Sequence, residues 1–495
     1  MSFNSINFLI FFPIVVLGYF ILPKKIKNIW LLISSYFFYM CWNPKYAIIL
    51  ATCTAVIYLS GILMDKVNGQ ISDDKKKKRN KKLILLGSVM INFLFLFYFK
   101  YLNFAISTFT ELFKGFGISF NVPQFDIILP VGISFFLFQA LSYSIDVYRN
   151  DTKVEKNFIK YALFVSFFPQ LVAGPIEKSK NLLKQLDKPK TFDFSRVRDG
   201  FLLMLWGYFL KLVIADRVAY FVDTVYNDYS FYSGMYFIIA TLLFAVQIYC
   251  DFAGYSTIAI GAAKILGIDL TKNFDSPYLS TSISSFWKRW HISLSDWFKD
   301  YIYIPLGGNK KGIVRKCINK LIVFLISGLW HGANITFVIW GLLNGLFVVI
   351  SDLLKQLFKK FNTKGLSKVL LKVCGFVVTF VLVNFTWIFF RAPNMVTATN
   401  IINSIFTTNN SNILHEGSIY SCGLDIYNFW LAIICIAVLL IVDICNRRGF
   451  AIREMIAKQK GIIRWTIIAL SIVFILTFGI WGSSYNAQNF IYFQF

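Results

Sequence analysis

Long apolar runs recur along the whole chain, and the segments between them hold most of the charged residues. Examples are Ile6–Leu22, Ala47–Met64, Leu83–Lys100 and Trp430–Val442 with its flanks. A helix needs about 20 apolar residues to cross the hydrocarbon layer of a bilayer, and roughly twelve stretches approach that length. The pattern predicts an all-α, polytopic membrane protein, with residues 1–495 in one membrane domain and roughly 11–12 transmembrane helices plus re-entrant and interfacial helices.

Composition supports this prediction and excludes other classes. Of the 495 residues, 57% are hydrophobic and 15% are charged, which is more apolar surface than a soluble core could absorb. The net charge of +25 does not indicate nucleic-acid binding, because the basic residues lie in loops between spans. The eight cysteines form no Cys-x-x-Cys pair, so we expect no metal site and no disulfide framework.

The basic loops also predict the topology, because short loops rich in Lys and Arg stay in the cytoplasm. A hairpin of Asn28–Cys41 and Tyr46–Met64 should turn at Trp42, Asn43 and Pro44, and Phe158–Val172 should be re-entrant. Both termini are then expected outside the cell. The predicted cytoplasmic clusters are Lys24–Lys27, Lys75–Lys82, Lys153–Lys160, Lys178–Lys190, Lys310–Lys320, Lys355–Lys360 and Arg447–Arg464.

Only three histidines offer a side chain whose ordinary pKa suits proton transfer near neutral pH. His331 lies in a turn of small residues between two apolar stretches, where an imidazole must be hydrogen-bonded or line a polar cavity. A catalytic role and a purely structural hydrogen bond to a carbonyl are both compatible with that position. His415 lies in a polar loop, where we expect a solvated side chain.

His291 lies in a segment rich in tryptophan. Trp290, Leu294, Trp297 and Tyr301 recur at helical spacing, and Trp287, His291 and Ser295 form an adjacent line. The segment could be an interfacial amphipathic helix with its tryptophans at the lipid headgroups, or it could contribute to a site. Asp251 could cap a helix or orient a site residue, whereas Lys211, Asp216 and Arg217 are expected to form ion pairs.

Several of these motifs together resemble the membrane-bound O-acyltransferase family, in its branch of alginate and peptidoglycan O-acetyltransferases. The resemblance spans nearly the whole chain, and the run at 304–308 with the extra C-terminal spans favours that branch over the teichoic acid D-alanylating one. The motifs are Asn273-Phe274, Pro277-Tyr278, Phe286-Trp287-Lys288-Arg289-Trp290-His291-Ile292-Ser293-Leu294-Ser295, Ile304-Pro305-Leu306-Gly307-Gly308, Leu329-Trp330-His331-Gly332, Trp387-Ile388-Phe389-Phe390-Arg391 and Phe490-Ile491-Tyr492-Phe493-Gln494-Phe495.

The resemblance implies that His331 and His291 are the catalytic residues, with His291 at the second motif position, where it could take a proton or shape the tunnel. It also implies a central tunnel that accepts the donor, for which the candidate lining residues are Trp287, Trp290, Ser295, Trp330, Asn334 and Asp251.

The expected activity is transfer of an acyl group, acetyl by this resemblance, across the plasma membrane of a bacterium. The donor would be a cytoplasmic thioester, acetyl-CoA or an acyl carrier protein thioester, and no bound cofactor is expected. The acceptor would be a hydroxyl of an extracytoplasmic SGNH-type acetyltransferase or of an envelope polysaccharide, and the lipids of the membrane are the other partners. A glycan transporter or flippase and a non-catalytic scaffold are the alternatives, although the chain lacks the two-half repeat typical of transporters.

Overall fold

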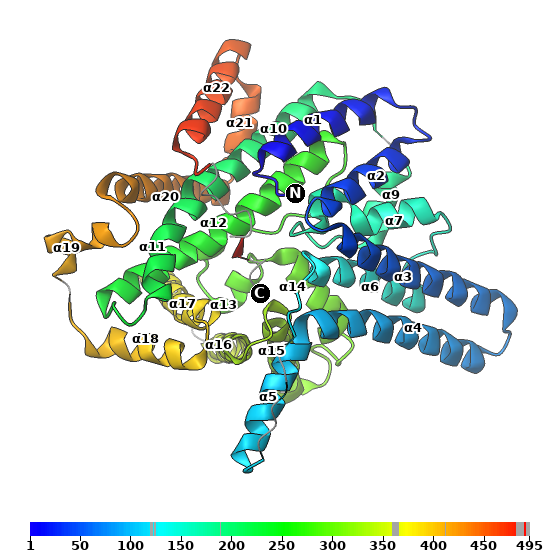
Figure 1. Cartoon of the computed structure of the whole chain (residues 1–495), viewed down its shortest axis with the longest axis horizontal. Coiled ribbons are helices and arrows are strands. Elements are labelled where there is room, and N and C mark those ends of the chain that lie inside the picture. The colour runs from blue at the N-terminus through cyan, green and yellow to red at the C-terminus, as the bar shows by residue number, and fades with distance from the viewer. Residues whose placement is uncertain are drawn as a thin grey trace. The chain divides into compact units, whose positions relative to one another are not determined.

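The computed structural model describes residues 1–118, 122, 125–188, 190–358, 366–410, 412–481 and 490–491. Its regular elements are helices, and no strand occurs within these ranges (Figure 1). The chain forms two compact units, Met1–Gly200 with Ala259–Thr271 and Phe201–Ile258 with Lys272–Phe495. The prediction of an all-α fold is confirmed, whereas the single membrane domain stays a prediction.

Polar side chains start the helices of the first unit where the sequence turns. Asn43 caps the helix that begins at Pro44, so the turn predicted at Trp42–Pro44 is confirmed, and Asp73 caps the lysine-rich start of the next helix. The helices are α1 (Ile6–Ile21), α2 (Lys27–Met40), α3 (Pro44–Gln70), α4 (Asp74–Leu96), the π-helix η1 (Phe97–Tyr101), α5 (Leu102–Gly115), α6 (Ile133–Arg149), α7 (Phe158–Ser166), α8 (Phe168–Leu171) and α9 (Ser179–Leu186).

The second unit contains the segments that hold both predicted site histidines. Its helices, including α10 and α12 that are shared with the first unit, are α10 (Phe194–Tyr208), the π-helix η2 (Phe209–Ala215), α11 (Asp216–Asn227), α12 (Met235–Ile265), the 3-10 helix η3 (Pro277–Leu279), α13 (Ile283–Trp287), α14 (Ile292–Phe298), the π-helix η4 (Lys299–Tyr303), α15 (Gly312–His331), α16 (Ile335–Phe358), α17 (Leu366–Arg391), α18 (Met395–Thr407), α19 (Ile413–Glu416), the 3-10 helix η5 (Ser418–Ser421), α20 (Ile426–Arg447), α21 (Ile452–Lys458) and α22 (Gly461–Phe478).

Seven helices within the described residues are long and apolar enough to cross a membrane. This number is below the predicted 11–12, because several apolar stretches form shorter or interrupted helices: α1 has 16 residues, and the stretch at 200–221 is divided among α10, η2 and α11. The seven are Pro44–Gln70, Asp74–Gly115, Met235–Ile265, Ile335–Leu357, Val369–Arg391, Ile426–Arg447 and Gly461–Phe478.

Two local predictions can be compared directly with the structure. The segment predicted to be re-entrant is broken at Phe167 into α7 and α8, and α8 is buried together with residues 161–166 of α7. The helix that contains the apolar run at 83–100 does not end at Lys100 but continues through η1 to Gly115. From Asp74 to Gly115 it has 42 residues. At about 1.5 Å per residue this helix is much longer than a bilayer is thick.

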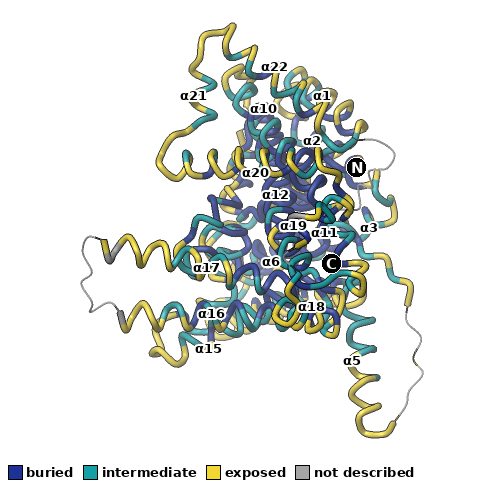
Figure 2. Tube along the Cα trace, turned by 90° about the vertical axis from the view of Figure 1, so that its left-hand side faces the viewer, coloured by how far each residue is buried: buried dark blue, intermediate teal, exposed yellow. Residues whose placement is uncertain are grey.

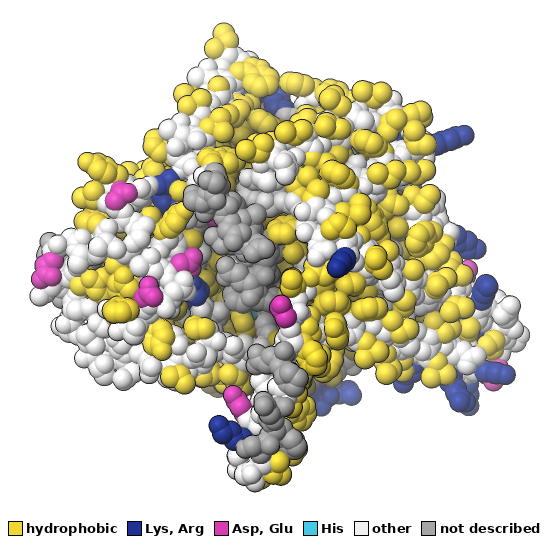
Figure 3. All heavy atoms as spheres, in the orientation of Figure 1, with side chains coloured by type: hydrophobic (Ala, Val, Ile, Leu, Met, Phe, Trp, Pro, Cys, Tyr) yellow, Lys and Arg dark blue, Asp and Glu magenta, His cyan; other side chains and the backbone are white. Residues whose placement is uncertain are grey.

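Exposed apolar side chains are frequent on this protein, as a lipid-facing surface requires. Figure 2 shows α5 and parts of α17 exposed, and α5 has no buried residue. In Figure 3 hydrophobic side chains cover much of the visible face, while Lys and Arg side chains gather at the turn between α3 and α4. The combination is typical of a protein whose apolar surface meets lipid.

Candidate active site

His331 is the last residue of α15, and a close helix crossing fixes its position. A Cβ on Gly341 would lie 2.4 Å from the Phe324 carbonyl oxygen, and a Cβ on Gly328 would lie 2.3 Å from that of Phe337. Only glycine at these positions lets the backbones of α15 and α16 approach so closely. The crossing holds the end of α15 against α16, and the His331 side chain is buried there.

An aromatic wall surrounds the His331 imidazole. Its ring centroid lies 4.9 Å from that of Trp330, 5.0 Å from that of Trp340 and 5.4 Å from that of Phe390, each in an edge-to-face arrangement. Trp340 stacks on Trp387 at 6.0 Å. Large rigid rings around one titratable group keep bulk water away and leave it a fixed orientation.

His291 lies at a sharp turn between α13 and α14. Its φ of +46° is in the left-handed region, which only three non-glycine residues of the described chain adopt. The alternative of one interfacial amphipathic helix, with its tryptophans at the lipid headgroups, is therefore wrong. Trp290 and Trp297 are both buried in the protein, because the turn directs α13 and α14 into the core of the unit.

Asn273 holds this turn. Its backbone carbonyl accepts a hydrogen bond from the Ile292 N–H at 2.9 Å, and its Oδ1 accepts from the N–H of Ser293 at 3.2 Å and from the Ser293 hydroxyl at 2.7 Å. Asn273 thus supplies acceptors for N–H groups at the start of α14 that have no partner within the helix. A residue in a sparsely populated conformation persists only where its surroundings over-determine it, and Asn273 does so for His291.

The structure brings the two predicted site histidines into contact with one tryptophan. The Trp330 ring lies 6.0 Å from His291 and 4.9 Å from His331. The His291 ring also contacts that of Phe252 of α12, at 4.7 Å. The histidines therefore belong to one buried cluster, although 40 positions separate them in the sequence.

Trp287, Trp290 and Ser295 take part in the same cluster. Trp287 contacts Trp340 at 5.6 Å, and Trp290 contacts Trp387 at 5.2 Å. The Ser295 hydroxyl donates to the backbone carbonyl of Trp287 at 3.2 Å, so Ser295 ties α14 to the end of α13. The two tryptophans extend the aromatic wall, whereas Ser295 supports the turn.

Asn334 caps a helix. Its Oδ1 accepts from the Thr336 N–H at 3.0 Å, and its Nδ2 donates to the Pro393 carbonyl at 2.9 Å. These bonds start α16 and join it to the segment after α17. Asn334 thereby fixes the turn that follows His331.

Asp251 lies in a buried group of charges. Its Oδ1 lies 2.6 Å from the Lys211 ammonium, which also pairs with Asp216 at 2.8 Å, and its Oδ2 accepts from the Ile491 N–H at 2.8 Å. The ion pairs expected for Lys211 and Asp216 are present, whereas Arg217 donates to Asn428 and to the Phe478 carbonyl. Asp251 directly precedes Phe252, the ring that contacts His291, and so lies next to the cluster.

Burial lowers the pKa of His291 from its ordinary value of 6.5 to about 3. The imidazole is therefore neutral at physiological pH. The neutral ring can shape the site, and it has one N–H donor and one acceptor nitrogen for hydrogen bonds. With so low a pKa it would be a weak base in proton transfer.

Several residues of the cluster were not among the predicted site residues. Asn273 appears in the sequence only as part of a motif, and Trp340, Phe390 and Phe252 are aromatic residues in apolar helices like many others. The signal that could have identified Asn273 is that it is a small polar residue within an aromatic motif. The side chain of His415 lies outside the described residues.

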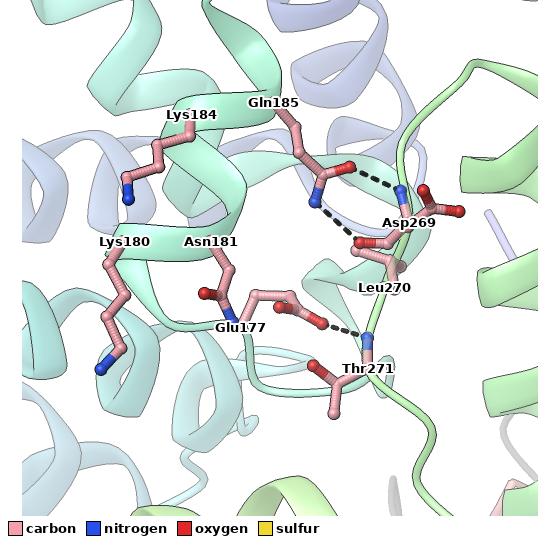
Figure 4. A pocket seen from close by; sticks show the side chains of 8 residues that line it. All are labelled: Glu177, Lys180, Asn181, Lys184, Gln185, Asp269, Leu270 and Thr271. Carbon is pink, nitrogen blue, oxygen red and sulfur yellow. Dashed lines mark hydrogen bonds between the residues drawn. The ribbon is translucent and has the colours of Figure 1, made fainter.

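A polar cavity of about 440 Å³ lies in the first unit and contains none of the predicted site residues. Figure 4 shows how α9 and the segment after α12 form it: both hydrogen-bonding atoms of the Gln185 amide pair with the backbone of Asp269, and Glu177 accepts from the Thr271 N–H. Although hydrogen bonds to Thr271 oppose it, burial raises the pKa of Glu177. The hydrogen bonds of the residues that line this cavity fix the loop after α12.

Comparison with known proteins gives a consistent result. A family model described as MBOAT, membrane-bound O-acyltransferase family, matches residues 149–392, which include every predicted site residue. A probable alginate O-acetylase of Pseudomonas putida is 34% identical over 88% of this chain and 87% of its own length. A peptidoglycan O-acetyltransferase of Helicobacter pylori is 33% identical over 82% and 79%, and a teichoic acid D-alanyltransferase of Bacillus subtilis is 26% identical over 48% and 63%.

Proposed function

The chain belongs to the membrane-bound O-acyltransferase family, and we propose that it moves an acetyl group from a cytoplasmic thioester to a hydroxyl outside the cell. That it is a multi-pass membrane acyltransferase follows from the family and from the apolar helices. The observation that carries the proposal is the buried aromatic cluster that joins His331 and His291 through Trp330.

His331 is the proposed general base. The hydroxyl oxygen of the acceptor attacks the thioester carbonyl carbon while the imidazole takes the hydroxyl proton, because an alcohol is a weak nucleophile until its proton leaves. The C–S bond then breaks, and the imidazolium returns the proton to the departing thiolate. The surrounding rings exclude water, which would otherwise hydrolyse the thioester.

His291 is proposed to shape the site. Its neutral ring contacts the rings of Phe252 and Trp330, and Trp330 in turn contacts His331. Trp287 and Trp290 extend the wall of the proposed donor tunnel, and Asp251, Ser295 and Asn334 fix the segments that carry it. Activation of the acceptor then depends on His331, and the fit of the substrates depends on His291 and the residues that form or support the tunnel wall.

The names of the relatives suggest the acceptor class. Alginate and peptidoglycan are both carbohydrate polymers with hydroxyl groups, and the relatives named for their acetylation are similar to this chain over most of its length. The proposed acceptor is accordingly a hydroxyl of an envelope polysaccharide or of an extracytoplasmic SGNH-type acetyltransferase that passes the acetyl group on. Cytoplasmic donor entry agrees with the basic clusters predicted inside, and in this topology both termini lie outside.

Purified protein in sealed vesicles can test this proposal. Acetyl-labelled thioester is supplied on one side and acceptor on the other, and label in the acceptor is measured. The proposal expects transfer across the membrane with the wild type and none above background with His331→Ala. Transfer that persists in His331→Ala contradicts the role of His331 as the general base. Glycan transport without acetylation identifies a transporter instead.

A further inference from the structure

Three basic side chains from distant parts of the second unit meet around Asp275. Lys272 pairs with Asp275 at 2.6 Å, and Arg289 donates at 2.6 Å to the other carboxylate oxygen and at 3.0 Å to the Asp275 carbonyl. Arg447, at the end of α20, donates to the Leu279 carbonyl and interacts electrostatically with Asp275 and Arg289. We call Lys272, Asp275, Arg289 and Arg447 the cationic cluster.

The cationic cluster is accessible and carries excess positive charge. The side chains of Lys272, Asp275 and Arg289 are 65%, 43% and 27% exposed. Although burial opposes it, the hydrogen bond and charge of Lys272, with Arg289 and Arg447 nearby, hold the pKa of Asp275 below its usual range. Three cations and one ionised carboxylate leave a net positive charge within the cluster, and the buried Asp443 carboxylate of α20, which interacts with Lys272 and Asp275, offsets part of it.

The positive-inside rule accounts for the sign of these residues but not for their convergence. That rule requires only that cytoplasmic loops be basic, and an isolated loop gains nothing from holding cations near one another. Like charges repel at short range, and Asp275 offsets only part of this repulsion, so their collection from three segments is favourable where a further anion binds among them. Arginine in particular presents paired N–H groups that match the oxygens of a phosphate.

A short backbone ladder connects the cationic cluster to His291. The Asp275 N–H donates to the Arg289 carbonyl at 3.0 Å, and the Ile292 N–H donates to the Asn273 carbonyl at 2.9 Å. Residues 273–275 therefore run alongside residues 289–292, which include both Arg289 and the His291 turn. An anion held by Arg289 is thus fixed to the same two segments that position the histidine.

We propose that Lys272, Arg289 and Arg447 bind a phosphate group of the thioester donor. This inference rests on the proposed function and names the chemical class of its donor: a thioester on a pantetheine arm that carries a phosphate at its far end. Coenzyme A and the phosphopantetheine of a carrier protein share this chemistry. The phosphate would anchor the donor at the surface while the arm carries the acyl group inward.

Binding measurements on the full-length protein in vesicles of neutral lipid can test this site without any turnover. The probes are coenzyme A, 4′-phosphopantetheine and pantetheine, with wild type, Arg289→Gln and Lys272→Gln. We expect the two phosphorylated probes to bind at least about tenfold more tightly than pantetheine, as one charge-assisted hydrogen bond would give. In Arg289→Gln this preference should fall by about tenfold, with pantetheine binding unchanged.

Matched controls come from the lysine-rich start of α4. Lys77 pairs with Asp74 three positions away, as Lys272 does with Asp275, and Arg79 is an exposed arginine nearby. Lys77→Gln and Arg79→Gln remove the same charges and should leave the preference at its wild-type value. Equal losses in these controls, or equal binding of all three probes by the wild type, would overturn the site.

The outcomes also separate this inference from the proposed function. If acetyl transfer occurs and Arg289→Gln leaves both transfer and the phosphate preference intact, the site is wrong and the function stands. If the phosphate preference depends on Arg289 but no acyl group is transferred, the function is wrong and the site stands. Apo and phosphopantetheinylated carrier protein then decide between the two donors, and competition by anionic lipid alone would assign the cluster to a headgroup and overturn the inference.

Discussion

The two histidines of the cluster are positioned by different means. His331 ends a 20-residue helix whose crossing with α16 depends on Gly328 and Gly341. His291 lies in a left-handed turn between two short helices, and hydrogen bonds to Asn273 hold the residues that follow it. One side chain is fixed by helix packing and the other by a local polar clamp, yet both meet Trp330.

The difference shows how a rigid site can be built within a membrane protein. Helix packing places a residue precisely when small residues let the backbones meet. A turn cannot rely on such packing, and its polar backbone groups require partners wherever water is excluded. Asn273 supplies these partners, so damage to helix packing should affect His331 first, and damage to the clamp should affect His291 first.

The largest expected effect separates the two roles. His331→Ala should lower kcat by about 10²–10⁴-fold, the contribution of a general base, whereas His291→Ala should lower it by about tenfold through misplaced substrates. Acetyl transfer measured at saturating donor gives both values, with thermal unfolding as the check on folding. Equal losses in the two variants would contradict the division of roles.

A substitution at the helix crossing tests the placement of His331. Gly341→Ala puts a methyl group 2.4 Å from the Phe324 carbonyl and should destabilise the protein by about 1–3 kcal/mol. Gly87→Ala in α4 is the control, because nothing lies within 4 Å of its Cβ and alanine is the better helix former by about 1 kcal/mol. Unfolding in detergent distinguishes them, and equal stability of the two variants would show that the crossing is loose.

Removing the Asn273 side chain tests the clamp. Asn273→Ala leaves the buried N–H and hydroxyl of Ser293 without their acceptor and should cost about 1–3 kcal/mol of unfolding free energy. Ser293→Ala loses one of the two bonds and should cost less. We expect Asn273→Ala to lower kcat more than it raises the KM for the donor, and a change in the donor KM alone would rule the clamp out as a support of His291.

The smallest expected effect is a pH dependence that belongs to His291. Its pKa is lowered in the folded state, so its contribution to stability is complete above pH 6.5 and is lost as the pH falls towards 3. Between pH 7.5 and 5.5 the wild type should lose about 1.4 kcal/mol more than His291→Asn, whose side chain does not titrate. Parallel unfolding curves for the two proteins would contradict burial as the cause.

Local signals in the sequence predicted many element boundaries. Asn43 with Pro44 marks a helix start, and Asp73 another, because the cap chemistry is encoded within a few residues. The break in the segment 158–172 was also predictable, from a proline in an apolar run. The turn at His291 was not predictable, because Trp290 and Leu294 keep helical spacing in the sequence even though the chain turns between them.

By itself, the sequence determined that this is an all-α membrane protein, which family it belongs to, and that His331 and His291 are its candidate site histidines. Apolar run lengths and motifs are written directly in the order of residues. Only the tertiary structure decided that Trp330 contacts both histidine rings, that Asn273 holds the His291 turn, and that Lys272, Arg289 and Arg447 converge on Asp275. Such contacts join residues far apart in the chain, and their distances follow from packing, which no local pattern encodes.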